Sequence, residues 1–174
     1  MVNEKHLDLI QKGVTEWNEW KSKNDEIIDF RKADLSKANL SKADLSKANL
    51  SEANLSKADL SGADLFGANL VEANLFEANL SGAIIDMALL FRADLRMADL
   101  HKTFLLKANL GGAKLRDADL HEAKMREANL SGASLFRANF TGANLFRLIS
   151  LGLICARLSS LGLICVRLIS LMLT

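Results

Sequence analysis

Large hydrophobic residues recur at every fifth position through the middle of the chain. From Phe30 to Leu145 this position is occupied in 24 consecutive units without an insertion. Alanine stands two places before it in 22 units, and aspartate or asparagine stands between the two in 18. The remaining two positions are mostly Ser, Lys, Glu or Gly, as in KADLSKANLSKADL. We call the large apolar residue the centre of its unit.

A period of five fits neither regular secondary structure. A helix would spread every fifth residue around all its sides, and a strand alternates sides with a period of two. Residues two apart, such as Ala and Leu here, face the same side of a short extended segment. Both stay inward only if the chain turns a corner in each unit, and Asp, Asn, Ser and Gly suit tight corners. The pattern therefore predicts an all-β coil with two positions inward and three outward.

The motif A-(D/N)-L-x-x over residues 28–147 resembles the pentapeptide-repeat family. The resemblance implies a right-handed, four-sided parallel β-helix with four units in each coil, which makes about six coils. At roughly 4.8 Å between stacked strands, such a tower rises about 29 Å. It also implies that residues twenty apart in the sequence are stacked neighbours.

Residues 1–27 are expected to cap the first coil, because repeat arrays need a terminal unit that covers the open end. Leu7, Ile10, Val14 and Trp17 are spaced three or four apart, as on one face of a helix. Trp20 extends that side, and the opposite side carries charged residues. We predict one amphipathic helix over residues 4–22; a helix that binds a partner is the alternative interpretation.

Residues 148–174 form an apolar tail with a ten-residue repeat. Counted from Arg147, the repeats read RLISLGLICA, RLSSLGLICV and RLISLMLT. Codons chosen for this peptide and shifted by one base read A-N-L-S-G-A-N-L, which is repeat sequence. We interpret the tail as out-of-frame repeat sequence. Leucine falls where the array requires alanine, so we expect the coil to stop at Arg147. A tail-anchored, membrane-associated scaffold is an alternative, but each 20-residue window contains an arginine, which is costly in a bilayer.

Composition argues against several activities. The 22 basic and 21 acidic residues give a net charge of +1, without the basic excess of nucleic-acid-binding proteins. Both cysteines lie in the tail, and the N-terminus lacks the apolar core of a secretory signal, so we expect a cytoplasmic protein. No catalytic set is recognisable, and we expect neither an enzyme nor a cofactor. His101 and His121 are stacked by the twenty-residue rule, but a metal site needs three or four ligands, so no metal site is predicted.

Departures from the repeat predict an interaction surface. Apolar residues replace outward polar ones in the middle coils, and together they form a possible patch of Phe66, Ile84, Met87, Leu89, Phe91, Phe104 and Leu106. Exposed apolar patches often mark contact surfaces, and simple decay of the repeat is the alternative. The predicted function is a non-enzymatic structural or protein-interaction module, binding an unknown protein or itself. The family resemblance also suggests a DNA-mimicking gyrase inhibitor or protector, although mimicry needs an acidic rod and Lys37, Lys42 and Lys47 interrupt it.

Overall fold

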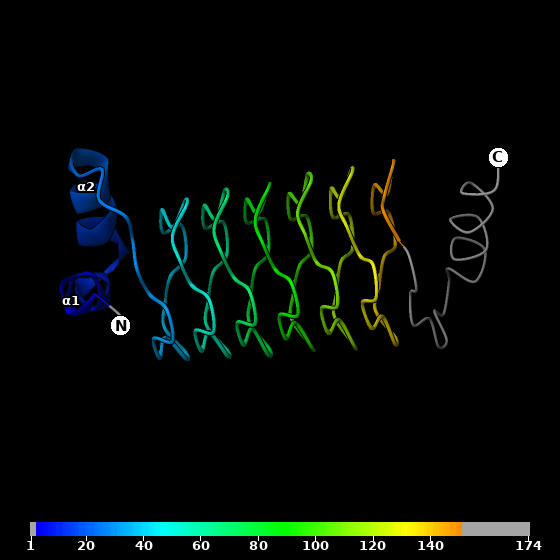
Figure 1. Ribbon diagram of the computed structural model, residues 1–174, viewed down its shortest axis with the longest axis horizontal. Coiled ribbons are helices and arrows are strands. Elements are labelled where there is room, and N and C mark those ends of the chain that lie inside the picture. The colour runs from blue at the N-terminus through cyan, green and yellow to red at the C-terminus, as the bar shows by residue number, and fades with distance from the viewer. Residues whose placement is uncertain (1–2, 151–174) are drawn as a thin grey trace.

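In the computed structural model the chain forms a tower of stacked coils with two short helices over its N-terminal end (Figure 1). The structure describes residues 3–150. Helix α1 spans Glu4–Lys12 and helix α2 spans Val14–Lys23. Over residues 29–149 the walls of the tower consist of single-residue parallel bridges rather than extended strands. Within the described ranges, no helix is long and apolar enough to cross a membrane.

Each bridge joins a residue to the residue twenty positions later, from Asp29 with Asn49 to Asn129 with Ile149. Backbone hydrogen bonds run in both directions at each step: Asn49 N–H donates to Ile28 O at 2.9 Å, and Phe30 N–H donates to Asn49 O at 2.8 Å. A coil therefore contains four units, and residues 28–147 make six coils. This confirms the four-sided, parallel architecture with twenty residues per coil.

The corners explain why the repeat needs its polar residues. In every unit the second residue after the centre has a φ between 56° and 70°, and the following alanine N–H closes the turn, as Ala33 does on Phe30 O at 3.0 Å. The Asp or Asn side chain accepts a bond from the backbone N–H two residues later, for example Ser36 N–H to Asp34 Oδ1 at 3.0 Å. All 18 Asp and Asn residues at this position make that bond.

Leu and Ala fill the inside of the tower, as the sequence predicts. From Leu40 to Phe140 every centre is buried, and most are fully inaccessible. The alanine before each centre is buried as well from Ala43 to Ala138. Thr103 takes one alanine position, and its hydroxyl donates to Leu100 O at 2.6 Å, so the buried oxygen is satisfied. The small alanine keeps the wall close to the large centres, and the interior is densely packed.

The cap differs from the single helix predicted over residues 4–22. Gly13 separates two helices, with a φ of 130° that is strained for other residues. Its N–H donates to Ile10 O at the end of α1, and glycine alone adopts this backbone conformation without strain. Ile10 and Trp17 are buried against the first coil. The turn at Gly13 lets both helices press on the coil, whereas one straight helix would leave it.

The cap also pairs with the exposed edge of the first coil. Trp17 Nε1 donates to Asp44 O at 2.7 Å. The side chain of Asn18 accepts from Asp44 N–H at 2.8 Å and donates to Lys42 O at 2.9 Å. On the adjacent wall, Asn3 N–H donates to Asp29 O at 3.1 Å. These groups take the place of a preceding coil, which protects an edge that would otherwise invite association.

The cap buries His6 almost completely, although no pattern in the sequence marks this residue as part of the core. Its ring lies 5.3 Å from the Trp20 ring and 6.2 Å from the Phe30 ring, between centroids. Nδ1 accepts from Asp29 N–H at 3.4 Å, and Nε2 lies 3.4 Å from the Glu26 carboxylate. The imidazole thus joins the apolar cap to the first wall of the tower.

At the other end, the expectation that the coil stops at Arg147 is wrong by one unit. Ile149 pairs with Asn129, donating to Ala128 O at 2.9 Å and accepting from Leu130 N–H at 2.8 Å. Leu148 occupies an alanine position and Ser150 a centre, and both are buried. The remaining prediction for the tail concerns residues 151–174, which lie outside the described residues.

Candidate interaction surface

The seven residues of the predicted patch all lie on the outside of the tower, with between 37% and 54% of their surface exposed. They belong to the second, third and fourth coils. They are distributed over the fourth wall, whose centres are residues 45, 65, 85, 105, 125 and 145, and the first wall, which contains Leu89. We refer to these seven residues below as the apolar patch.

The densest part of the apolar patch lies on the fourth wall. Ile84 is bridged directly to Phe104 of the next coil. The ammonium of Lys124, one coil further, lies 4.1 Å from the centroid of the Phe104 ring. Phe66 and Leu106 directly follow two centres of the fourth wall and lie two coils apart at its edge. With Ile84 and Phe104, the fourth wall and its edge therefore carry four of the seven residues.

The rest of the apolar patch turns a corner onto the first wall. Met87 stands at the corner itself, with a φ of 60°. Leu89 lies between Asn69 and Asn109 in its bridge column. Phe91 packs over Gly111, where an added Cβ would come within 3.2 Å of the Phe91 ring. Because these residues wrap around a corner, one flat partner surface cannot cover all seven.

Three residues of the apolar patch lack the side-chain acceptor that the repeat uses at its turns. Ile84, Leu89 and Phe104 stand where 18 other units place Asp or Asn, and an apolar side chain cannot accept the turn N–H. For Phe104, the N–H concerned belongs to Leu106, and Asp86 Oδ1 from the coil below accepts it instead at 2.7 Å. The turn is thus stabilised from a different coil while the apolar side chains remain exposed.

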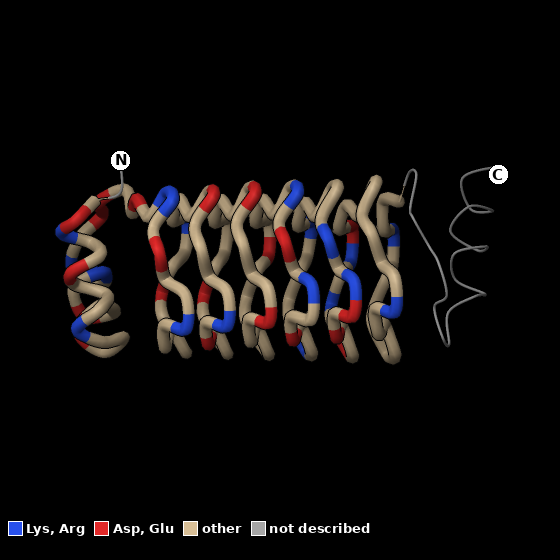
Figure 2. The backbone as a smooth tube through the Cα atoms, turned by 90° about the horizontal axis from the view of Figure 1, so that it is seen from below, with Lys and Arg blue, Asp and Glu red and all other residues tan. Residues whose placement is uncertain are grey.

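Away from the apolar patch, charges of opposite sign pair along the columns. Lys32 lies 3.4 Å from Glu52, Lys57 lies 3.4 Å from Glu77, and Arg137 lies 3.0 Å from Asp117, each pair twenty residues apart. Figure 2 shows the two signs interspersed over the visible side of the tower. Such pairs are individually weak because they are exposed to solvent. Together they leave a mixed surface rather than an acidic one.

Two aspartates have lowered pKa values because arginines bond to them. The guanidinium of Arg31 lowers the pKa of Asp29, with a closest approach of 2.6 Å. Burial of Asp94 acts to raise its pKa, but the hydrogen bonds from Arg96 and the positive charges of Arg96 and Lys114 together outweigh that effect and lower the pKa overall. These shifts accompany corner and wall structure, and neither aspartate faces a nucleophile or a metal ligand set.

The stacked histidines bond to acidic neighbours rather than to each other. His101 Nδ1 lies 2.8 Å from Asp99 Oδ1, and His121 Nε2 lies 3.0 Å from Glu122 Oε1. Over residues 3–150, no group of three or more His, Cys, Asp or Glu side chains is arranged to hold a metal ion.

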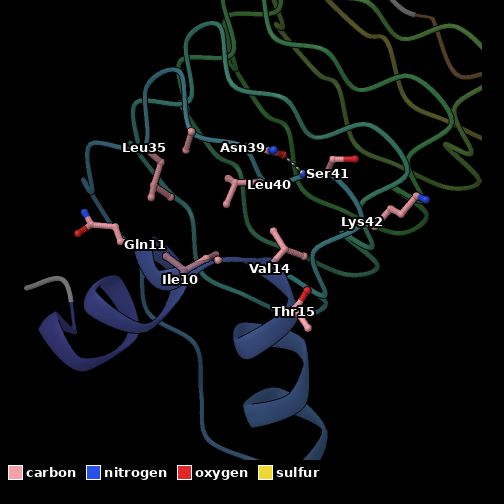
Figure 3. Close-up of a pocket in the computed structure, with 11 residues that line it drawn as sticks. Ile10, Gln11, Val14, Thr15, Leu35, Asn39, Leu40, Ser41 and Lys42 are labelled. Carbon is pink, nitrogen blue, oxygen red and sulfur yellow. Dashed lines mark hydrogen bonds between the residues drawn. The ribbon is translucent and has the colours of Figure 1, made fainter.

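A cleft of about 640 Å³ lies where the cap leaves the first coil uncovered. Figure 3 shows Ile10 and Val14 on the helix side and Leu35 and Leu40 on the tower side. The cleft follows from the cap contacts, which are made to the first and fourth walls, whereas Asn39 of the third wall borders the cleft. It contains no catalytic arrangement, and nothing in the structure indicates a ligand for it.

Several proteins of known structure are similar to this chain. The chain is similar to a pentapeptide repeat protein from the Arabidopsis thaliana thylakoid lumen, with 31% identity, 62% of this chain and 68% of that chain covered, and a TM-score of 0.41. It is similar to HetL, a pentapeptide repeat protein involved in heterocyst differentiation regulation from the cyanobacterium Nostoc, with 35% identity, coverage of 75% and 73%, and a TM-score of 0.31.

A trypsin-treated form of QnrB1, a plasmid-mediated fluoroquinolone resistance protein, shares 22% identity over 81% of this chain and 83% of that one, with a TM-score of 0.57. This likeness shows a shared fold and no more. None of the curated proteins matches the chain. The sequence profile described as Pentapeptide repeats matches with eight copies, over residues 28–66, 53–90, 93–132 and 113–147. With two inward positions in every unit, four units in every coil and this match over most of its length, the chain belongs to the pentapeptide repeat family, whose members form right-handed quadrilateral β-helices.

Proposed function

We propose that the protein is a non-enzymatic interaction module and that the apolar patch is its contact surface. The observation that carries this proposal is the position of the patch. Its residues stand in outward positions that the repeat gives to polar side chains, and each exposes at least 37% of its surface. The core is filled by other residues, so folding of the tower does not require the patch.

The hydrogen bonds support the same proposal. Ile84 and Leu89 each give up a turn acceptor that 18 other units keep, which removes a bond worth about 0.5–1.5 kcal/mol. Phe104 gives up the same acceptor, but the Leu106 N–H bonds to Asp86 instead. Between 37% and 44% of the surface of these three residues stays exposed in the isolated chain. Contact with a partner would bury them, and large apolar or aromatic residues at the centre of an interface contribute strongly to binding.

The proposal is tested by returning the three positions to the repeat consensus. The variant I84N/L89N/F104N restores the polar pattern and is expected to fold as well as the natural chain. The matched control, Met97→Lys, removes an apolar residue that is 54% exposed but lies on the second wall, outside the patch. Both proteins and the natural chain are used as bait in extracts of the host cell.

We expect the natural chain and the Met97→Lys control to retain the same partner, and the consensus variant to lose it. Equal retention by all three proteins would contradict the assignment of the contact surface. The alternative function, inhibition or protection of gyrase by DNA mimicry, predicts instead a dose-dependent effect in a supercoiling assay. The paired Lys–Glu columns do not favour it, and the membrane-anchored alternative depends on the tail beyond the described residues.

A further inference from the structure

Opposite charges flank the apolar patch along the fourth wall. Asp64, Ile84, Phe104 and Lys124 follow one another in a single column, each bridged to the next. At about 4.8 Å per coil, Asp64 and Lys124 lie about 14 Å apart. Asp64 is half-buried and Lys124 is exposed, so both charges are accessible from the side of the tower. The column therefore has an acidic end, an apolar middle and a basic end.

We propose that this wall binds a second copy of the same chain, with the two towers side by side and antiparallel. The inference rests on the proposed function, because it assigns a partner to the same apolar patch. The two-fold axis of this pair lies between the two facing walls, perpendicular to the tower axis, at the level between Ile84 and Phe104. It sets Ile84 opposite Phe104 of the second copy. It also sets Asp64 opposite Lys124 of the second copy, so the pair contains this charged contact twice. Two-fold pairs of this kind are the commonest protein assemblies.

The order of charges selects the antiparallel arrangement. In a parallel pair with its axis along the tower, Asp64 would face Asp64 and Lys124 would face Lys124, and both contacts are repulsive. Lys124 already lies over the Phe104 ring at 4.1 Å, which places its ammonium at the border of the apolar centre. From there it can point one N–H at a carboxylate of the second copy while its stem covers Phe104.

Among residues 3–150, neither helix covers this wall. Asp86, in the corner column between Phe66 and Leu106, has its carboxylate bonded to the Leu106 N–H at 2.7 Å, so it is partly satisfied within its own chain. The helices lie over the end of the tower rather than along its sides (Figures 1 and 2). The surface available on one wall is narrow, which places the pair among small, weak interfaces of less than about 1,200 Å².

The test is a charge exchange between two variants of the full chain, followed by analytical ultracentrifugation under reducing conditions. Asp64→Lys and Lys124→Asp each turn both attractive contacts of the pair into repulsive ones. Each variant alone is expected to self-associate about tenfold more weakly than the natural chain. In an equimolar mixture, one variant carries lysine at both positions and the other carries aspartate at both. Opposite charges then face each other again in the mixed pair, so association is expected to return.

Asp59→Lys and Lys114→Asp are the matched controls, because they make the same changes on the third and second walls. Neither control is expected to alter self-association. The inference is overturned if the natural chain stays monomeric up to about 1 mM, or if the mixture associates no better than each variant alone. Its failure is distinguishable from that of the proposed function. A monomer that still captures a host protein through the apolar patch refutes only the second-copy partner, whereas a patch whose loss changes neither measurement refutes both.

Discussion

Replacing Asn18 by alanine is expected to loosen the cap from the tower. The Asn18 amide bonds to two backbone groups of the first coil, at 2.8 Å to Asp44 N–H and at 2.9 Å to Lys42 O. One coil further along the same wall, the equivalent donor is Asp64 N–H, which donates to Ala43 O of the preceding coil at 2.9 Å. Asn18 thus supplies with a side chain what an additional coil would supply with its backbone.

The size of the effect follows from these two bonds. Each contributes about 0.5–1.5 kcal/mol, and both sites are reached by water to some extent, so their loss should cost about 1–3 kcal/mol. Alanine is the better helix former and returns about 0.5 kcal/mol of this. We expect a net loss of about 0.5–2.5 kcal/mol in cap docking. Asn18→Asp keeps the acceptor for Asp44 N–H and should show a smaller loss, while Glu19→Ala on the exposed side of α2 should show almost none.

The chain offers a separate signal for the cap and for the tower. Its two tryptophans, Trp17 and Trp20, both lie in α2, so tryptophan fluorescence reports on the cap. Far-ultraviolet circular dichroism reports mainly on the coils. In urea titrations of Asn18→Ala, the fluorescence midpoint should fall clearly, and the circular dichroism midpoint should fall less. If the fluorescence midpoint equals that of Glu19→Ala, the side-chain bonds do not hold the cap and the reasoning is wrong.

Three further predictions concern the tower. Ala68→Leu adds three carbons at a fully buried wall position and should cost about 1–3 kcal/mol in urea unfolding, whereas Ser56→Lys at an outward position should change little; equal midpoints would show that Ala68 is not confined. Ile84→Asn and Leu89→Asn restore the turn acceptor and should raise the thermal unfolding midpoint. Phe104→Asn should raise it less, because the Leu106 N–H already bonds to Asp86. A fall in all three midpoints would contradict this account of the corner. The pKa values of Asp29 and Asp94 are lowered in the folded chain, so their contribution to the free energy of unfolding is present above the unfolded pKa of about 3.9 and is lost as pH falls through the folded values. Thermal unfolding at pH 7 and below pH 4 should show this loss of stability. The Asp94→Asn variant should lose less stability between the two pH values.

The sequence alone determined the repeating part of the molecule. Period five with Ala and Leu two apart fixes which side chains face inward, because each unit obeys the same local rule of one short extended segment and one corner. The outward position of Ile84, Leu89 and Phe104 follows from that rule as well, since they replace residues of known orientation. The number of units in a coil came from the family resemblance, and the bridges between residues twenty apart confirm it.

Only the tertiary structure decided what happens where the repeat ends. His6 becomes buried, and Asn18 and Trp17 bond to the first coil, through contacts between residues 23 to 27 positions apart that follow no period. The bond from Leu106 N–H to Asp86 joins two coils and replaces a local bond that the sequence pattern predicts to be lost. Leu148 takes an alanine position in the last described unit and is buried there. The repeat pattern reports interactions within each unit, and these can be predicted from nearby residues. At an end of the array or at an irregular unit, the stabilising group comes from a distant part of the sequence, and only the folded structure shows which group that is.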